Sequence, residues 1–226
     1  MRQIVLDTET TGLDPAQGHR IIEIGAVEIV DRRCTGNNFH VYLNPERPCD
    51  PEAVRVHGLT DDFLADKPLF AEQVEAFLAY LGDAELIIHN APFDLGFLKA
   101  ELQRLGRPAL QNPVFDSLTE ARRRFPGQKN DLNTLCRRFF VDNSQRSLHG
   151  ALLDCELLAE VYLAMTGGQV DIGLQENSPT SVAEQRSAPR PTLRPQGKLR
   201  VITASAEEEA AHAAYLAEMG NALWPQ

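Results

Sequence analysis

The stretch Asp7-Thr8-Glu9-Thr10-Thr11-Gly12 decides the predicted fold, and it directly follows the short apolar run Ile4-Val5-Leu6. An apolar run of this kind is typical of a buried strand. Because side chains alternate between the two faces of a strand, Asp7 and Glu9 are expected to project from the same side. Two carboxylates that close raise each other's pKa unless a cation lies between them. Oxygen ligands of this kind suit Mg²⁺ or Mn²⁺ rather than zinc.

A purely structural explanation fits the same stretch. An isolated Asp-x-Glu is often the polar end of a strand that enters a turn, and Gly12 would then supply a positive φ angle. The choice between a turn and a metal site therefore depends on what the rest of the chain places beside the two acids.

Composition indicates one globular domain with an appendage. The chain has 226 residues, of which 43% are hydrophobic, and this is enough for a packed core. Its net charge of -10 argues against a protein that binds nucleic acid through bulk charge. The four cysteines are scattered without a Cys-x-x-Cys pair, as expected for reduced thiols. The early Asp7 argues against a signal peptide, and no apolar run is long enough for a membrane span, so a cytoplasmic location is expected.

Hydrophobic periodicity predicts an antiparallel meander followed by alternating helices and strands. Strands are predicted at residues 4–6, 21–30, 39–43, 85–89 and 114–116, with a turn at 31–33. Helical segments are predicted at residues 52–57, 70–81, 93–105, 117–125, 132–140 and 150–165. This order implies an α/β fold in which helices cover both faces of a mixed sheet.

The sequence changes character after Gly168. Residues 175–198 are rich in Pro, Ser, Gln and Arg, which is typical of a flexible linker. A strand at 199–202, an amphipathic helix at 206–219 and an anchor at Leu223-Trp224 are predicted beyond it. This tail is too short to form its own core, so it is expected to fold onto a partner. The predicted organisation is a folded domain at 1–168, a linker at 169–198 and a docking segment at 199–226.

Basic residues are concentrated in one segment of the folded part. Between positions 122 and 149, seven basic residues stand against only Asp131 and Asp142. The seven are Arg122, Arg123, Arg124, Lys129, Arg137, Arg138 and Arg146. Such a segment is either a solvated helix face or a local phosphate-binding patch on an otherwise acidic protein.

Two further acids and one histidine accompany Asp7 and Glu9. Asp94 follows a predicted strand at the start of a helix, where it could simply serve the helix macrodipole. Asp154 lies on a mostly apolar helix, and a carboxylate there is costly to bury without a cation or a donor. His149 lies five residues before Asp154, in the predicted loop. Four acids and a histidine are what a two-metal phosphoryl-transfer site requires.

The order D-x-E-T-T-G, H-N-A-x-F-D and H-x-A-x-x-D resembles the DEDD exonuclease superfamily of the histidine subtype (DEDDh). The resemblance is greatest to the family of proofreading epsilon subunits of bacterial DNA polymerase III, and it covers residues 1–168. In the tail, Lys198-Leu199-Arg200-Val201 and Ala210-Ala211-His212 resemble the polymerase-binding region of that family. The resemblance implies an RNase H-like fold with a five-stranded mixed sheet flanked by helices.

The resemblance also implies a role for each site residue. Asp7, Glu9 and Asp154 would hold one divalent ion, Mg²⁺ or Mn²⁺. Asp7 would bridge to a second ion that Asp94 holds directly or through water, and His149 would be the general base that activates the attacking water.

Four more positions match residues that contact the terminal nucleotide in such enzymes, beside Asp7, Glu9 and Asp154: Thr10, Leu13, His57 and Phe93. Leu13 would lie beneath the last base. Each has a structural alternative, because an apolar side chain beside a turn often belongs to the core. His57-Gly58-Leu59-Thr60 equally suits a helix end followed by a new helix start.

The function that follows is a 3′→5′ exonuclease that removes mismatched nucleotides from a DNA 3′ end and releases 5′-mononucleotides. Its expected partners are DNA, the polymerase catalytic (alpha) subunit through residues 199–226, and a sliding clamp through Gln169, Ile172 and Leu174 of the hexamer 169–174. A small theta-like accessory subunit is a further expected partner. The alternatives are a DEDDh exoribonuclease of RNA maturation, a non-catalytic polymerase assembly subunit and a remote RNase H-type nuclease.

Overall fold

The computed structural model describes residues 1–167 and 204–218, and each of these two parts is described here by itself. The first part contains a mixed sheet with the strand order β3-β2-β1-β5-β6, in which β4 also pairs with β2. The strands are β1 (Arg2–Thr10), β2 (Ile21–Val30), β3 (Arg33–Cys34), β4 (Phe39–Tyr42), β5 (Glu85–Ile88) and β6 (Val114–Asp116). Strand β1 is central, because it pairs antiparallel with β2 and parallel with β5.

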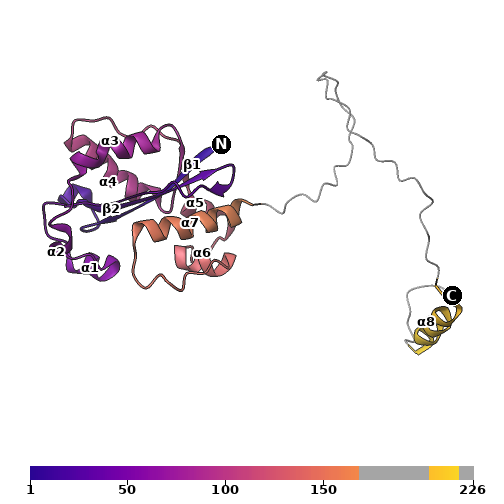
Figure 1. Cartoon of the computed structure of the whole chain (residues 1–226). Helices are drawn as coiled ribbons and strands as arrows, with labels where there is room; N and C mark the ends of the chain where they lie inside the picture. Colours follow the sequence, from indigo (N-terminus) through magenta and orange to yellow (C-terminus); the bar gives the residue numbers. More distant parts are fainter. Residues whose placement is uncertain (168–203, 219–226) are drawn as a thin grey trace, which may run out of the picture. The chain divides into compact units, whose positions relative to one another are not determined.

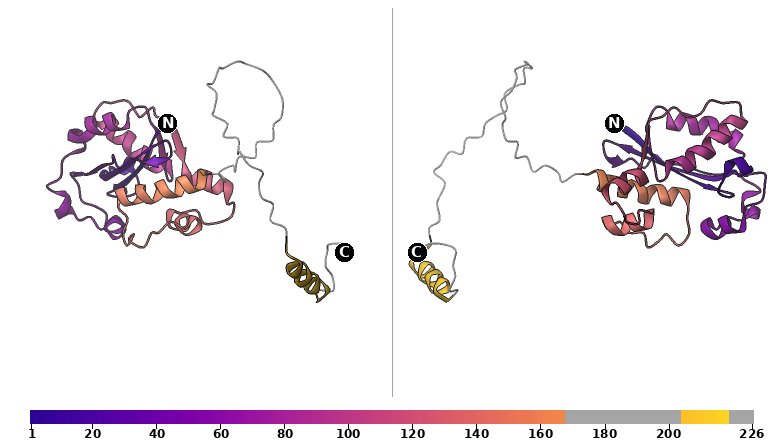
Figure 2. Two further views of the ribbon diagram at one scale, coloured as in Figure 1. Left: turned by 45° about the vertical axis from the view of Figure 1, so that its right-hand side comes forward. Right: turned by 180° about the vertical axis from the view of Figure 1, so that it is seen from behind.

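Helices cover both faces of the sheet, as predicted. They are the 3₁₀ turn η1 (Pro15–Gln17), α1 (Pro51–His57), α2 (Asp61–Leu64), α3 (Phe70–Leu81), α4 (Ala91–Arg104), α5 (Ser117–Arg124), α6 (Leu132–Phe139) and α7 (Ala151–Thr166). One apolar core lies beneath α3 and α4, and a second lies beneath α5, α6 and α7. Figure 1 shows α3 and α4 on one side of the strands and α6 and α7 on the other, and the turned views in Figure 2 agree.

The pleat of β1 divides its side chains between the two cores. Ile4 and Leu6 belong to the core under α3 and α4, whereas Val5 belongs to the core under α7. By the same alternation, Asp7 and Glu9 lie on the same face of β1 as Val5, which is the face covered by α7. Helix α7 approaches the sheet closely at Gly25 of β2, where a Cβ atom would lie 2.3 Å from the backbone of Ala151. This glycine therefore lets the first turn of α7 lie against the sheet beside β1.

The structure confirms the predicted mixed sheet and the new helix start after His57-Gly58-Leu59-Thr60, and it differs from the prediction in the number of strands and at Gly12. The sheet has six strands rather than five, because the predicted turn at 31–33 runs into the two-residue strand β3. Asp31 and Arg32 make that turn with φ angles of 48° and 64°. Helix α2 begins behind Thr60, whose hydroxyl accepts a hydrogen bond from Phe63 N at 3.3 Å. Gly12 is not among the residues with positive φ. A Cβ atom there would lie 2.3 Å from the His19 ring, so the ring requires the glycine.

The second described part contains helix α8 (Ala206–Glu218), close to the predicted helix at 206–219. Ser205 and Glu208 cap its start reciprocally, with Glu208 N donating to Ser205 Oγ at 3.3 Å and Ser205 N donating to the Glu208 carboxylate at 2.8 Å. The predicted linker, the hexamer 169–174, the strand at 199–202 and the anchor Leu223-Trp224 lie outside the described residues. No helix in the described parts of the chain is long and apolar enough to cross a membrane.

Candidate active site

A cavity of about 990 Å³ lies at the end of β1 that carries the acidic stretch. It is lined by the end of β1 and the turn that follows, by α1, by the start of α4, by α5 and the segment that leads into α6, and by the loop before α7 together with the first turn of α7. Every site residue that the sequence predicts within residues 1–167 contributes to this lining, namely Asp7, Glu9, Thr10, Leu13, His57, Phe93, Asp94, His149 and Asp154. The fold therefore brings together residues that are up to 147 positions apart in the sequence, from Asp7 to Asp154.

The carboxylates of β1 are held at high pKa. Burial, with the charges of Asp94, Glu9 and Asp154, raises the pKa of Asp7 well above its ordinary value. Burial, followed by the charge of Asp154, raises the pKa of Glu9 to about 8. The raised pKa values show that the site without a cation disfavours the charged form of these acids, and a bound cation relieves this condition.

Asp94 is fixed by the strand that carries the other two acids. It lies in the first turn of α4 and is 2% exposed. Its Oδ1 accepts hydrogen bonds from Thr8 N at 3.0 Å and from Thr8 Oγ1 at 2.7 Å. Burial raises the pKa of Asp94 to about 7, although the bonds from Thr8 oppose the shift. The two bonds from Thr8 of β1 fix the orientation of the Asp94 side chain. The role of Asp94 is therefore not limited to the start of helix α4.

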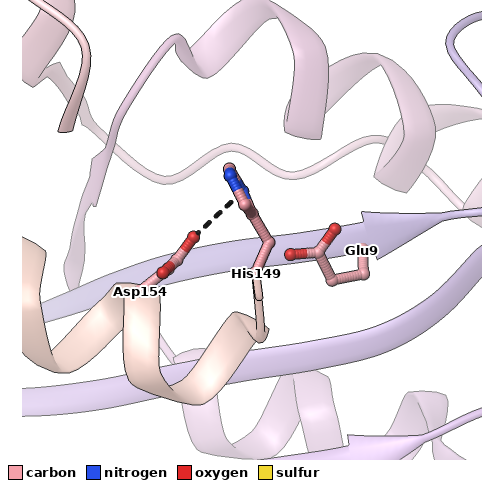
Figure 3. Close-up of side chains that lie close together, drawn as sticks. All are labelled: Glu9, His149 and Asp154. Carbon is pink, nitrogen blue, oxygen red and sulfur yellow. Dashed lines mark ion pairs between the residues drawn. The ribbon is translucent and has the colours of Figure 1, made fainter. Parts of the chain in front are cut away.

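Glu9, His149 and Asp154 form a compact group in the cavity. One potential ligand atom from each of the three lies within 4.8 Å of the other two. His149 Nδ1 is 3.4 Å from Asp154 Oδ2, and Figure 3 shows the ring directed toward this carboxylate with Glu9 beside it. Burial and the charge of Arg146 lower the pKa of His149, while Asp154 opposes the shift. The imidazole is therefore held toward its neutral form, which a general base requires.

His149 belongs to a loop that α1 and Arg146 hold in place. His149 N donates to Val56 O of α1 at 3.0 Å. Arg146 donates to both oxygens of Asp154, from Nε and from Nη2, each at 2.5 Å. The sequence analysis placed Arg146 only in the basic segment and missed this contact, for which the sequence offers no local signal.

The expected nucleotide contacts have different surroundings. Leu13 is 83% exposed at the cavity, so it is not a core residue. Phe93 is half-buried and packs on Phe97 at a centroid distance of 5.1 Å. His57 is buried at the end of α1, where Gly58 adopts φ 75°, and its Nδ1 accepts from Leu59 N at 3.0 Å. Thr10 Oγ1 donates to Gly12 O at 2.7 Å. His57 and Phe93 thus fill structural positions and line the cavity as well.

The basic segment divides into two groups. Arg122, Lys129 and Arg146 line the cavity. The other four are engaged elsewhere: Arg123 and Arg124 pair with Glu120, Arg137 donates to Thr134, and Arg138 lies over the Phe125 ring at 4.1 Å. Only part of the segment therefore faces the cavity, and the phosphate-binding patch stays a prediction for those three residues.

The comparisons with known proteins agree with this geometry. The exonuclease family model RNase_T matches residues 4–162. The DNA polymerase III subunit epsilon of Escherichia coli (strain K12) is 52% identical, over 99% of this chain and 97% of the relative. The corresponding subunit of Pasteurella multocida (strain Pm70) is 49% identical, over 99% of this chain and 93% of the relative.

Solved structures show the same fold. Exonuclease X in complex with 5′ overhanging duplex DNA is 27% identical with a TM-score of 0.59, over 72% of this chain and 90% of that chain. The nuclease domain of 3′hExo, a DEDDh family member bound to rAMP, has a TM-score of 0.62 at 18% identity, over 73% and 90% of the two chains.

The chain therefore belongs to the exonuclease family, among the DNA polymerase III epsilon subunits. Its activity is that of a 3′–5′ proofreading exonuclease, and membership of this exonuclease family implies dependence on divalent metal ions. The donor set described above fits that requirement, because it consists of carboxylate oxygens, and burial raises the pKa values of Asp7, Glu9 and Asp94.

Proposed function

We propose that the cavity hydrolyses the last phosphodiester of a DNA 3′ end with two divalent ions and His149 as general base. The observation that supports the proposal most strongly is the convergence of Asp7, Glu9, Asp94 and Asp154 with His149 on one cavity. Asp7 and Glu9 come from β1, Asp94 from α4, His149 from the loop between α6 and α7, and Asp154 from α7 itself. The fold is therefore what brings the five residues together.

Each acid has a stated task in this proposal. Asp7, Glu9 and Asp154 hold one ion, and Asp7 together with Asp94 serves the second. Mg²⁺ and Mn²⁺ are the ions that an all-oxygen donor set favours. When bound, the two ions stabilise the charge that develops on the attacking and leaving oxygens. Thr8 fixes the orientation of Asp94 through its two hydrogen bonds, so the donor geometry is set before substrate arrives.

His149 takes the proton of the attacking water. Its lowered pKa keeps the ring neutral near physiological pH, where an imidazole can accept a proton. Its ring is 45% exposed at the cavity, so a water molecule can reach it.

The polarity of cleavage comes from a pocket for the terminal nucleotide. The exposed Leu13 lies beneath the last base, while Phe93, Thr10 and His57 complete the pocket. Only a free 3′ nucleotide can enter, so only the last phosphodiester reaches the acids. A mismatched end is cheaper to unstack than a paired one, and this accounts for selectivity toward mismatches.

The segments after the catalytic domain (residues 1–168) deliver the enzyme to its substrate. The relatives are named as subunits of DNA polymerase III, which supports association with a polymerase and with DNA in the cytoplasm. In the proposal, Gln169, Ile172 and Leu174 bind the sliding clamp, and residues 199–226 bind the polymerase catalytic (alpha) subunit. Residues 169–198 link the two and raise the effective concentration of the exonuclease at the primer end. A small theta-like subunit is a further proposed partner.

Digestion of labelled oligonucleotides tests this function. With Mg²⁺, the full chain should shorten a 3′-mismatched primer-template faster than the paired one and release 5′-mononucleotides. Preference for RNA of the same sequence would instead support an exoribonuclease of RNA maturation. Absence of Mg²⁺-dependent and Mn²⁺-dependent hydrolysis in a folded chain would support a non-catalytic assembly subunit.

A further inference from the structure

Arg146 lies where the proposed metal ligands meet the proposed base. Its guanidinium binds both oxygens of Asp154 at 2.5 Å, and Nη2 is also 3.0 Å from Nδ1 of His149. The Arg146 side chain is 5% exposed, comparable to that of Asp154 at 4%. A bidentate guanidinium–carboxylate pair of this burial is among the strong and geometrically specific interactions of proteins. Arg146 is therefore an integral, buried residue of the site.

The positive charge of Arg146 compensates the acids of the cavity. Within residues 1–167 and 204–218, Arg146 is the one lysine or arginine that hydrogen-bonds to any of the four acids. Its charge also lowers the pKa values of Asp7 and Glu9, against the effect of burial. Arg122 and Lys129 line the same cavity, yet they form no ion pair with these acids. At Asp154, a single arginine thus supplies the positive charge that a bound cation would supply.

The pair with Arg146 competes with metal coordination by Asp154. The guanidinium occupies one hydrogen-bonding position on each of the two carboxylate oxygens, which are the atoms that a divalent ion would contact. The two cations would also repel each other at such short range. An ion that binds Asp154 is therefore expected to displace Arg146.

The contact with His149 has a consequence for catalysis. A guanidinium has five N–H donors and no acceptor, so Nδ1 of His149 must accept in this contact. A neutral imidazole carries one proton, and with Nδ1 as acceptor that proton is assigned to Nε2. The single lone pair of the ring is then covered by Arg146. In this arrangement His149 cannot take a proton from water.

We propose that Arg146 is a positioning residue that locks the site. It holds Asp154 and covers the basic nitrogen of His149 until a divalent cation takes Asp154, and its release then frees His149 to act as base. The inference rests on the proposed metal site and adds to it a coupling between metal binding and the base. Without metal, the contacts of Arg146 therefore keep the loop that carries His149 ordered and also keep His149 from acting as a base.

Direct metal binding tests the lock. The full chain is titrated with Mn²⁺ by electron paramagnetic resonance, in the wild type and in Arg146→Gln, and melting is followed in EDTA. Arg146→Gln should bind Mn²⁺ about fivefold or more tightly, as expected when a coupled competitor is removed. The same variant should melt at a lower temperature in EDTA, because Asp154 loses its partner. A merely structural role for Arg146 predicts lower stability together with weaker or unchanged Mn²⁺ binding.

Two variants make the experiment decisive. Arg137→Gln is the matched control, since Arg137 is exposed and donates only to Thr134, and it should leave Mn²⁺ affinity unchanged. Arg146→Lys keeps the charge but not the bidentate geometry, and it should bind Mn²⁺ more tightly than the wild type even if Arg146→Gln fails to fold. Equal Mn²⁺ affinity in the wild type and in the folded Arg146 variants overturns the lock alone. A wild type that binds no Mn²⁺ overturns the proposed metal site itself.

Discussion

Two walls of the active-site cavity are held in place by different means. The strand wall consists of β1 and the start of α4, and it carries Asp7, Glu9 and Asp94. Here Asp94 is aimed by two hydrogen bonds from Thr8, one of them from the backbone of β1. The loop wall consists of residues 141–154, where His149 is held through its backbone by Val56 and Asp154 is held by Arg146.

The difference separates what is fixed from what can respond to ligands. The strand wall is anchored by regular secondary structure, so its donor geometry does not depend on a cation. The loop wall is anchored by a side-chain ion pair that competes with a cation for the same oxygens. We therefore expect changes to the acids of the strand wall to act on metal binding and chemistry directly. Changes to Arg146 on the loop wall should act through its competition with a cation for Asp154.

The largest expected effect is on the strand wall. Asp7→Asn or Glu9→Gln should lower the exonuclease rate by about 10⁴-fold or more, because metal-ion stabilisation contributes several kcal/mol to the transition state and 1.36 kcal/mol is tenfold. The fold should be retained. Burial and the charges of the neighbouring acids disfavour the ionised form of Asp7 and Glu9, and a neutral amide removes this unfavourable charge. Single-turnover rates with Mg²⁺ measure the effect. A rate near that of the wild type in either variant would remove that residue from the metal site.

A smaller loss is expected from the base of the loop wall. His149→Ala should reduce the rate by about 10²–10⁴-fold while Mg²⁺ and DNA binding persist, as is usual for loss of a general base. The wild-type rate should rise with pH as His149 loses its proton, and the rise should occur below the ordinary pKa of about 6.5 because burial lowers the pKa of this ring. A pH profile that is unchanged in His149→Ala would assign the base role to another group.

The sequence predicts the strand wall better than the loop wall. Asp7 and Glu9 lie two apart on a strand, and the face that they share follows from the pleat. Asp154 is recognisable because an acid on an apolar helix needs a partner. The contact of Arg146 depends on how a loop between two helices folds back, and no local spacing dictates that path. The exposure of Leu13 and the contact of Gly12 with His19 are likewise tertiary, and the two-residue strand β3 is too short for a periodic signal.

The acids also predict how stability depends on pH in EDTA. The pKa of Glu9 is raised to about 8 and that of Asp94 to about 7, whereas both are near 4 in an unfolded chain. Groups that bind protons more tightly when folded stabilise the protein below about pH 4, and this contribution is lost as pH rises toward 7 and 8. The melting temperature in EDTA should therefore fall between about pH 5 and pH 8. Mg²⁺ should flatten the fall, and so should Glu9→Gln. A melting temperature that rises with pH in EDTA would contradict the raised pKa values.

The smallest effect on catalysis is expected from residues outside both walls. Gln169→Ala combined with Leu174→Ala should weaken binding to the sliding clamp and leave hydrolysis of free oligonucleotides unchanged, since both changes leave the four acids and His149 in place. Surface plasmon resonance on the immobilised clamp measures the clamp affinity, and a gel assay measures the hydrolysis of free oligonucleotides.

Truncation after Gly168 is the matching experiment for the polymerase. The shortened chain should remain an active nuclease that no longer co-purifies with the polymerase catalytic subunit. Undiminished polymerase binding by the shortened chain would place that contact on the catalytic domain.

The most direct measurement of the central claim is anomalous diffraction from crystals of the wild type soaked in Mn²⁺ with an uncleaved 3′ nucleotide analogue. Two manganese peaks about 4 Å apart are expected, with Asp7 contacting both ions and Asp94 and Asp154 on opposite sides. The guanidinium of Arg146 should have left Asp154 in the same map. A single peak away from Asp7, or the Arg146–Asp154 pair intact beside a fully occupied ion at Asp154, would contradict the account.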